Sequence, residues 1–480
     1  MPANSAGPEP LGRDLLRLMG VLLAGASVAL LDTTIVAVAM EELTRAFGTT
    51  VRTAQWATTG YLLAMAAAIP LLGWLTDRWG ARRVWLGTLW VFLAGSALCG
   101  LAWSIESLIV FRVVQGLGAG LILPLVQAIL AGAAGPQRIG RVMGLIGIPG
   151  QLAPILGPVV GGLVLGSLGW RWIFLVNIPL CLLALALAHR HLHPPPPRGR
   201  ARLDLTGALL LVPGTVAILA GLTLADDLSN SPTTAVGLLA GGAALLAGFV
   251  LHARRRGEAA LVDLRLFRYR SFSTATVMMF LSGASLYGPM LLLPLYYQQA
   301  RGVPVGEVGW LVAPQGLGLM AGLWVAGRWA DRGGPRIVAL TGAALACAGL
   351  GVFVLAGGAP LPVLSAGLVA LGAGLGGIGV AVSATAYRDL PAAVIPRATS
   401  LLNVVQRIGA SVGTVVVAFV LHRLLAGLDT ATAFAHTFAW ALGFAAVAAL
   451  VMPFLPATAP APPPPADTHD TEARTTTCEP

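Results

Sequence analysis

GWLTDRWGAR at Gly73–Arg82 and GRWADRGGPR at Gly327–Arg336 are two copies of one pattern. Each copy carries a glycine, an Asp-Arg pair four residues later, a second glycine and a closing arginine. Each copy also separates two long apolar runs. A pattern that recurs in this way indicates a chain built from two related halves, and paired halves of apolar helices are an arrangement found in membrane transporters.

The composition around these two stretches excludes a soluble protein. Of the 480 residues, 56% are hydrophobic and only 10% are charged, whereas soluble domains carry about 25% charged residues. The same hydrophobicity excludes disorder except at the ends of the chain. We therefore predict an all-α integral membrane protein that is embedded in a lipid bilayer.

Fourteen apolar runs are each long enough to cross a bilayer, which takes about 20 helical residues. The runs cover residues 17–40, 54–75, 84–103, 106–130, 142–166, 171–188, 205–225, 233–252, 272–295, 308–327, 337–356, 362–385, 400–425 and 434–455. The two copies of the loop pattern are eight helices apart rather than six. Two six-helix halves with an inserted helix pair between them explain this offset.

The predicted spans divide the chain into seven segments. In chain order these are a cytoplasmic tail at 1–16, a six-helix half at 17–188, a cytoplasmic loop at 189–204, two inserted linker helices at 205–252, a second cytoplasmic loop at 253–271, a six-helix half at 272–455 and a cytoplasmic tail at 456–480. The last tail is rich in proline and threonine, and we expect it to be disordered.

The arginines predict how the chain is oriented in the membrane. All 30 basic residues are arginine, and 23 of them fall in alternate loops that include both termini. Because cytoplasmic loops retain positive charge, both termini are expected in the cytoplasm and the chain in the cytoplasmic (inner) membrane. This topological role also explains the net charge of +10, so the charge is no indication of a nucleic-acid partner.

Further motifs follow one another along the chain. They are LDTTIV at Leu31–Val36, RVVQGLGAG at Arg112–Gly120, GPVVGG at Gly157–Gly162, WRWIFLVNIP at Trp170–Pro179 and LRLFR at Leu264–Arg268. Together with the repeated loop pattern, these motifs resemble the major facilitator superfamily, and within it the fourteen-helix drug:proton antiporters of the EmrB/QacA type.

This resemblance implies a function as well as a fold. It implies a monomeric secondary transporter, not an enzyme, that exports small amphipathic drugs or toxic compounds, needs no cofactor and is driven by the proton gradient. A dedicated exporter of one endogenous metabolite, antibiotic or lipid is an alternative. A second alternative is a membrane sensor or assembly protein built on a carrier fold. We favour the exporter of amphipathic compounds; a sensor would normally keep an additional soluble domain, and the longest predicted cytoplasmic loop is too short for one.

Two charged residues within the spans are candidates for proton coupling. Asp32 is the only acidic residue well inside a span, where an ionisable group is costly and commonly functional. Arg112 is expected at a similar depth, so the two side chains can form a switchable pair. Gln115, Thr33 and Thr34 are candidates for a supporting polar network. The alternatives are a hydrogen-bonded acid and an arginine that reaches the membrane interface.

The repeated loop pattern is interpreted as a gating element. Its glycines, Gly73 and Gly80, allow a close helix approach and a tight turn. Asp77 is expected to form a charge cluster with Arg78 and Arg82 that fastens the cytoplasmic face in one state. The second copy supplies Asp331 and Arg332 at the corresponding places. The alternative is charge that only sets orientation, which does not explain the repeated aspartate because acids contribute little to orientation.

The fifth predicted helix carries Gly157, Pro158, Gly161 and Gly162. In the family that this chain resembles, this antiporter motif seals the interface between the two halves. Without the family, small residues four apart indicate only close helix packing.

Several aromatic and basic side chains are candidates for lining a substrate cavity. They are Trp56, Tyr61, Tyr287, Tyr296, Tyr297 and Arg407. For Arg407, a position near the cytoplasmic end of its helix and a position in the cavity are both open. The later helices carry no extra acid, from which we infer a neutral or monocationic substrate.

No pattern indicates catalysis or metal binding. Neither metal-ligand spacings nor nucleotide-binding motifs occur among the cysteines, histidines and glycines. His189, His191 and His193 lie beside four prolines, where we expect a solvated loop rather than a metal site.

Overall fold

The computed structural model describes residues 11–135, 137–192, 202–225, 232–355 and 358–455. Every regular element in this part of the chain is helical, so the predicted all-α fold is confirmed. Thirteen helical segments are long and apolar enough to cross a membrane. A further helix, α7 (Ile139–Leu168), has 30 residues and occupies the place of the fifth predicted span.

The first half of the chain forms one bundle. Its elements are α1 (Arg13–Val38), α2 (Met40–Ala46), α3 (Val51–Ala68), η1 (Ile69–Leu71), α4 (Leu72–Trp79), α5 (Ala81–Gly100), α6 (Ile105–Ala134), α7, α8 (Arg171–Leu175) and α9 (Asn177–His191). A short 3₁₀ turn at Pro70 separates α3 from α4 within the second span. This interruption is expected because proline removes a backbone donor from the helix.

The second half forms the other bundle. Its elements are η3 (Leu264–Arg268), α12 (Arg270–Leu295), the π-helical η4 (Tyr296–Ala300), α13 (Val305–Gly333), α14 (Pro335–Leu355), α15 (Leu361–Arg388), α16 (Ile395–Leu425), α17 (Thr430–Val451) and η5 (Met452–Phe454). Helix α16 begins five residues earlier than its predicted span at 400–425. The polar residues Arg397, Thr399 and Ser400 lie within its first two turns. Arg397 and Ser400 donate hydrogen bonds to the first bundle, and Thr399 donates to the backbone of α16 itself, so each of these polar side chains is satisfied within the helix.

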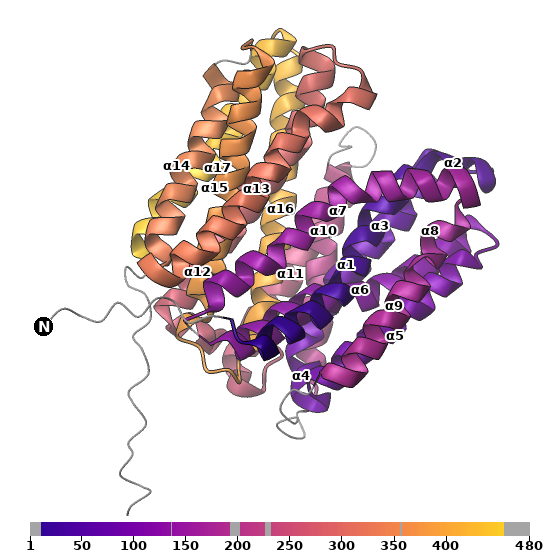
Figure 1. Cartoon of the computed structure of the whole chain (residues 1–480), viewed down its shortest axis with the longest axis vertical. Coiled ribbons are helices and arrows are strands. Elements are labelled where there is room, and N and C mark those ends of the chain that lie inside the picture. Colours follow the sequence, from indigo (N-terminus) through magenta and orange to yellow (C-terminus); the bar gives the residue numbers. More distant parts are fainter. Residues whose placement is uncertain (1–10, 136, 193–201, 226–231, 356–357, 456–480) are drawn as a thin grey trace, which may run out of the picture.

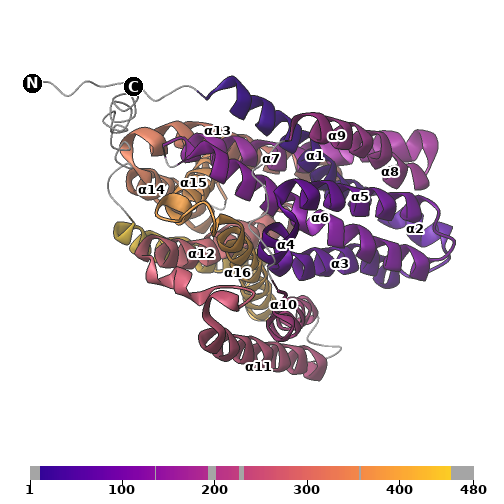
Figure 2. The same ribbon diagram turned by 90° about the horizontal axis from the view of Figure 1, so that it is seen from below.

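The inserted pair consists of α10 (Leu205–Ala225) and α11 (Pro232–Arg256), followed by η2 (Gly257–Ala259). Helix α10 packs against α11, and it also contacts α3 of the first bundle and α16 of the second. Figure 2 shows α11 at the edge of the molecule, with α10 between it and the bundles. The inserted pair is therefore in contact with both halves through α10.

The two bundles meet at one end and diverge from it (Figure 1). The meeting end contains the turns between α4 and α5 and between α13 and α14, where Gly80 and Gly334 adopt φ angles of 78° and 84°. We call this end, at which the two bundles meet, the arginine-rich end. A side chain at φ values of this kind would be strained, so these two turns require glycine.

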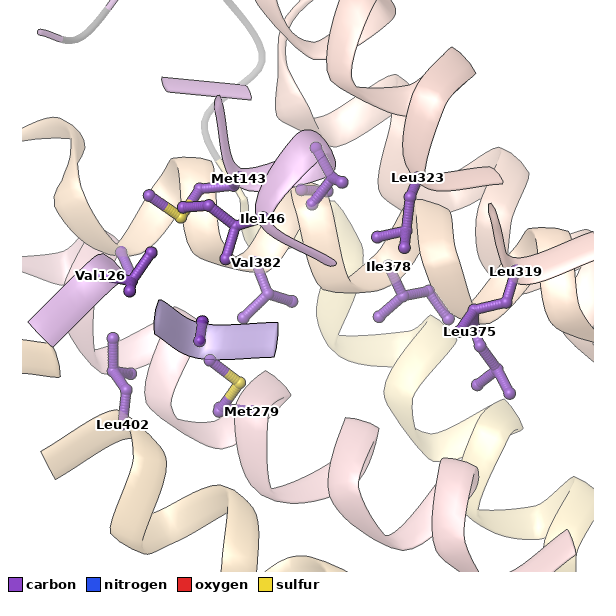
Figure 3. Close-up of a cluster of buried hydrophobic side chains, with 14 of the residues drawn as sticks. Val126, Met143, Ile146, Met279, Leu319, Leu323, Leu375, Ile378, Val382 and Leu402 are labelled. Atoms are coloured by element: carbon purple, nitrogen blue, oxygen red, sulfur yellow. The ribbon is translucent and has the colours of Figure 1, made fainter. Parts of the chain in front are cut away.

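An apolar cluster crosses from one bundle to the other near this end (Figure 3). Ile146 of α7 points toward Val382 of α15, and Val126 of α6 faces Leu402 of α16. Between membrane-spanning helices such side chains hold the halves together mainly by van der Waals packing, because lipid tails are as apolar as they are. The contact between the halves is thus apolar at this place, and the polar groups that join the halves lie beside it.

Candidate functional site

A buried ion pair lies inside the first bundle. Arg112 of α6 donates from Nη1 to Oδ2 of Asp32 in α1 at 2.7 Å. Neither side chain has any exposed surface. A buried pair of this kind is costly unless further hydrogen bonds satisfy both groups, and the surrounding side chains supply them.

Two amides complete the hydrogen bonding of the carboxylate. Gln115 Nε2 donates to Asp32 Oδ1 at 2.9 Å, and Asn177 Nδ2 at the start of α9 donates to the same oxygen at 2.7 Å. Gln115 also accepts from Arg112 Nη1 at 2.7 Å and donates to Ser96 of α5 at 2.7 Å. The Asp32 carboxylate thus has donors from two helices besides its own, α6 and α9.

Arg112 is held on its other side by α3. Its Nε donates to the carbonyl oxygen of Ala57 at 3.2 Å, and its guanidinium lies 3.8 Å from the centre of the Tyr61 ring. In the described part of the chain, Nη2 finds no hydrogen-bond acceptor. The aromatic ring therefore partly replaces an acceptor through a cation–π contact.

The helices of this site can approach because of small residues on α6. A Cβ at Gly116 would overlap the carbonyl oxygen of Tyr61, and one at Gly120 would overlap that of Met65. Glycine at these two positions brings the backbone of α6 against α3. This approach places Arg112 over the Tyr61 ring.

Of the predicted supporting residues, Gln115 joins Asp32 and the two threonines do not. Thr33 donates its hydroxyl hydrogen to the carbonyl oxygen of Leu30. Thr34 lies within hydrogen-bond distance of the carbonyl oxygens of Leu31 and Ala153. Hydroxyls inside a helix commonly bond to the preceding turn in this way, so the prediction for Thr33 and Thr34 is wrong.

Asn177 and Ser96 also belong to this site, although the sequence pattern does not predict them. Asn177 was visible only as part of the WRWIFLVNIP stretch, at the start of a predicted span. An amide at a helix start has an ordinary capping interpretation. Nothing in the linear pattern indicates that its side chain reaches Asp32, 145 positions earlier.

The antiporter motif packs within the first bundle rather than between the bundles. A Cβ at Gly157 would overlap Thr34 of α1, and Gly161 lies against Ile35 of the same helix. Gly162 is exposed, with no neighbour within 4 Å of a built Cβ. The side chain of Pro158 lies outside the described part of the chain. The expected role of this motif in sealing the halves is therefore wrong for its glycines.

Other glycines of α7 meet the second bundle. Gly140 approaches Asp331 and Gly327, and Gly144 and Gly147 both pack on Leu323 of α13. These residues lie in the first turns of α7, nearer the arginine-rich end than the motif. The close approach of the halves depends on them.

Two ion pairs join the bundles at the arginine-rich end. Asp77 at the end of α4 accepts from Arg397 of α16 at 2.8 Å, and Asp331 at the end of α13 accepts from Arg141 of α7 at 2.7 Å. Asp331 also accepts from the backbone N–H of Gly140 at 2.9 Å. Each aspartate thus meets the first turns of a helix in the opposite half, where the helix dipole favours negative charge.

This pairing corrects the predicted composition of the charge cluster. Arg82 donates to the carbonyl oxygen of His189 at 2.8 Å, and Arg78 and Arg332 are exposed. The partners of the two aspartates are arginines from the other half. Gly73 has a role in this contact, since a Cβ there would overlap the side chain of Arg397.

A cavity of about 390 Å³ lies between the bundles. Its lining residues come from α3, α6, α10, α12 and α16, and are Thr59, Leu62, Leu63, Leu123, Leu219, Leu222, Thr223, Tyr287, Asn403, Gln406, Arg407, Ala410, Ser411, Thr414 and Val415. Asp32, Arg112 and Gln115 are not among them. Helix α10 forms part of the wall, so the inserted pair contributes to the cavity.

Two of the predicted cavity residues line this cavity, Arg407 and Tyr287. Tyr61 instead belongs to the Arg112 site and has no exposed surface. Trp56 is exposed and is not part of the lining. Tyr296 and Tyr297 are buried among aromatic rings of the second bundle, Tyr296 against Phe353, Phe434 and Phe438.

No metal site is found among the described residues. His193 lies outside them, and His189 and His191 are exposed in the last turn of α9 rather than in the expected loop. A separate polar cluster lies where the inserted pair begins. Asp204 is nearly fully buried and lies 2.8 Å from Nε2 of His252. Burial alone would raise the pKa of Asp204, but hydrogen bonds from His252 and two backbone N–H groups outweigh it and hold the pKa below its usual value.

Comparison with known proteins agrees with this architecture. The family profile of the Major Facilitator Superfamily matches residues 22–414 and 275–477. The multidrug resistance protein B homolog of Mycobacterium tuberculosis (strain H37Rv) is 40% identical over 424 residues, which are 86% of this chain and 77% of the relative. The putative multidrug resistance protein MdtD of Salmonella heidelberg is 29% identical over 82% of this chain and 83% of its own length.

Among solved structures, the human organic anion transporter MFSD10 superposes with a TM-score of 0.68 over 91% of this chain and 99% of its own, at 17% identity. At this identity the match concerns the fold alone. The profile match covers most of the chain, and the mycobacterial relative is similar over 86% of it. The family expected from the sequence motifs is thereby confirmed. The chain belongs to the major facilitator superfamily, whose members are multi-pass membrane proteins and secondary transporters that move small substrates across the membrane.

Proposed function

We propose that this transporter exports small amphipathic organic compounds across the cytoplasmic membrane in exchange for protons. The observation that carries the proposal is the Asp32–Arg112 pair, buried at 2.7 Å inside a span. Ionisable groups within spans commonly mark proton relays. The names of the relatives, multidrug resistance proteins, support export of drug-like compounds.

The geometry suits one step of proton exchange. Hydrogen bonds from Arg112, Gln115 and Asn177 satisfy the ionised carboxylate of Asp32 in the present state. A proton that reaches Asp32 removes the charge that holds Arg112. The guanidinium is then free to turn toward another acceptor, and α1 is released from α6. Release of the proton on the other side of the membrane restores the pair.

The ion pairs at the arginine-rich end serve as the gate. Asp77–Arg397 and Asp331–Arg141 hold α4 to α16 and α13 to α7. The arginine-rich end faces the cytoplasm, because positive charge is retained on that side. The structure then corresponds to a state closed to the cytoplasm. Opening toward the cytoplasm requires both pairs to separate, so the pairs link the gate to the transport cycle.

The proton gradient is the energy source, and no cofactor takes part. The protein works as a monomer, because each of the proposed elements (proton site, cavity and gate) is complete within one chain. The proton site lies inside the first bundle and the cavity between the bundles. A reorientation of the two bundles therefore changes access to the proton site and to the cavity together.

The test compares two Asp→Asn variants of the full chain in inside-out membrane vesicles. Uptake of a fluorescent amphipathic dye is measured with an imposed proton gradient, with and without a protonophore. We expect Asp32→Asn to abolish gradient-driven uptake while the protein remains inserted, and Asp14→Asn, at an exposed position in the first turn of α1, to behave as wild type. Gradient-driven uptake that survives Asp32→Asn contradicts the proton site, and wild-type uptake that is insensitive to the protonophore contradicts the proposed function.

A further inference from the structure

The cavity between the bundles has two chemically different walls. Five polar residues come from one helix, α16, namely Asn403, Gln406, Arg407, Ser411 and Thr414. Most of them recur every three or four residues, which places them on one face of the helix. The lining from α3, α6 and α10 is mainly apolar and supplies five leucines, Leu62, Leu63, Leu123, Leu219 and Leu222, together with the threonines Thr59 and Thr223.

Arg407 lies deep in this polar wall. It follows the start of α16 at Ile395 by twelve residues, or about 18 Å at the rise of an α-helix. That depth is too great for a side chain to reach the membrane surface from the arginine-rich end. A guanidinium stays protonated in proteins, so Arg407 brings a full positive charge to the cavity.

This charge has no protein partner in the described part of the chain. Arg407 forms no ion pair or hydrogen bond there, in contrast to Arg112, which is paired with Asp32. None of the residues that line the cavity is acidic. Charged groups within a membrane protein normally pair with another group or mark a substrate pathway. Arg407 lies on the cavity wall, which leaves its counter-charge to come from a ligand.

Several of the neighbouring polar groups already use their donors within the protein. The hydroxyls of Thr414 and Thr223 donate to carbonyl oxygens of their own helices. The amide of Asn403 donates to Gln127 and to the backbone of Thr399. Arg407 offers up to five N–H groups, in a planar arrangement that matches the oxygens of a carboxylate or sulfonate.

We infer that the cavity binds an amphipathic organic monoanion, with its acidic group on Arg407 and its apolar body against the leucines of α3, α6 and α10. The inference rests on the proposed export function and specifies its substrate class. It revises the expectation of a neutral or monocationic substrate. The scarcity of acidic residues in the later helices argues against a divalent cation as substrate. It does not favour a monocation over an anion.

The charge of the substrate has an electrical consequence. When one external proton enters and one internal monoanion leaves, each movement makes the inside more positive by one charge. An inside-negative membrane potential therefore drives this exchange. Exchange of a proton for a monocation moves no net charge. Tyr61 of α3 stacks on Arg112 at 3.8 Å, and the next two residues of α3, Leu62 and Leu63, line the cavity, so one helix joins the proton site to the cavity.

The test uses three dansyl-labelled probes that share an undecyl chain and end in a sulfonate, a trimethylammonium or a neutral alcohol. The charges of the first two are fixed, so neither probe carries protons across the bilayer by itself. Binding to the purified full chain is measured by dansyl fluorescence. Uptake into proteoliposomes is measured under an imposed proton gradient, with and without a potassium diffusion potential.

We expect the sulfonate to bind most tightly and its uptake to respond to both the proton gradient and the potential. Arg407→Gln should weaken sulfonate binding by about tenfold to a hundredfold, as for the loss of a hydrogen bond to a charged group, and leave the neutral probe nearly unaffected. Arg407→Glu should reverse the preference toward trimethylammonium. Arg423→Gln, on the same helix but stacked on Phe419 outside the cavity lining, is the matched control.

Thermal unfolding of each variant establishes that it is folded, and Arg407→Gln alone suffices if the charge reversal does not fold. Sulfonate binding that is unchanged in Arg407→Gln overturns the inference. Wild-type preference for trimethylammonium, with proton-driven uptake intact, also overturns it but leaves the proposed function standing. Uptake of all three probes that ignores the proton gradient is instead a failure of the proposed function.

Discussion

Asp77 and Arg397 are 320 positions apart in the chain and form an ion pair at 2.8 Å. The pair formed by Asp331 and Arg141 repeats this relationship with the halves exchanged, at 2.7 Å. In each pair an aspartate at the end of one helix meets an arginine in the first turn of a helix from the other bundle. The repeated loop pattern is thus an interface motif, and it joins the halves at two related places.

The first prediction concerns this gate. Asp77→Asn keeps the shape of the side chain and removes the charge, so it should weaken the closed arginine-rich end. Both side chains are partly exposed, and a pair of this kind is worth about 1 kcal/mol at most. We expect about a fivefold shift toward the state open at this end, measured from the distance between fluorescent labels placed on α4 and α16.

The control for the gate is Asp263→Asn. Asp263 pairs with Arg265 within one loop at 2.9 Å, so its loss should leave the label distance unchanged. A double-mutant cycle of Asp77→Asn with Arg397→Gln should give a coupling energy of about 1 kcal/mol. Additive effects of the two substitutions would show that the pair does not hold the gate.

Some of this arrangement follows from local pattern and some does not. The spans and the repeated loops are predictable because hydropathy and glycine turns depend on neighbouring residues. The partners of Asp77 and Asp331 are not, because nearby Arg78 and Arg332 offer the same charge in the sequence. Only the packing of α4 on α16 and of α13 on α7 decides between them.

The site residues show the same division. The similar depth of Asp32 and Arg112 follows from counting residues along two antiparallel helices. Arg407 is different, because the helix face on which it lies depends on where α16 begins and how α16 packs. A helix start at residue 400, as predicted, does not determine that face. Asn177 is similar: its side chain joins Asp32 only because α9 packs against α1 and α5.

The second prediction tests Asn177. Asn177→Ala removes a 2.7 Å hydrogen bond to Asp32 and leaves that carboxylate with one donor fewer. We expect a loss of about 1–3 kcal/mol in the free energy of unfolding, because a hydrogen bond to a buried charged group is lost. The same substitution in an Asp32→Asn background should cost less, since no charge remains to be satisfied. Equal losses in both backgrounds, measured by thermal unfolding, would place Asn177 outside the proton site.

The third prediction uses two glycines of the antiporter motif as a matched pair. Gly157→Ala introduces a methyl group that overlaps Thr34, two residues from Asp32. Such overpacking typically costs about 1–3 kcal/mol, and the displacement of α1 should also lower proton-driven transport. Gly162→Ala adds its methyl group to open space and should retain wild-type stability and transport. Similar behaviour of the two variants would show that contact between α1 and α7 is unimportant here.

The fourth prediction concerns Asp204, which holds the start of α10 to the end of α11. Its carboxylate accepts from the backbone N–H groups of Gly207 and Leu261, both at 3.1 Å, and lies beside His252. These partners hold the pKa of Asp204 below its ordinary value although burial opposes them. A carboxylate with a depressed folded-state pKa stabilises the fold above its unfolded-state pKa, and this contribution is lost as the pH falls through the folded-state pKa.

The stabilisation from Asp204 should therefore be complete at neutral pH and decline only below about pH 4, the unfolded-state value for aspartate. Asp204→Asn removes the charge at every pH, so the difference in melting temperature between wild type and variant should be largest near neutrality and shrink in acid. Asp14→Asn, at an exposed site, should show almost no difference at any pH. A difference for Asp204→Asn that stays constant into acid would mean that its charge does not stabilise this junction. Because α10 forms part of the cavity wall, loosening the junction should also weaken binding of the dansyl sulfonate, whereas a purely peripheral inserted pair would leave binding unchanged.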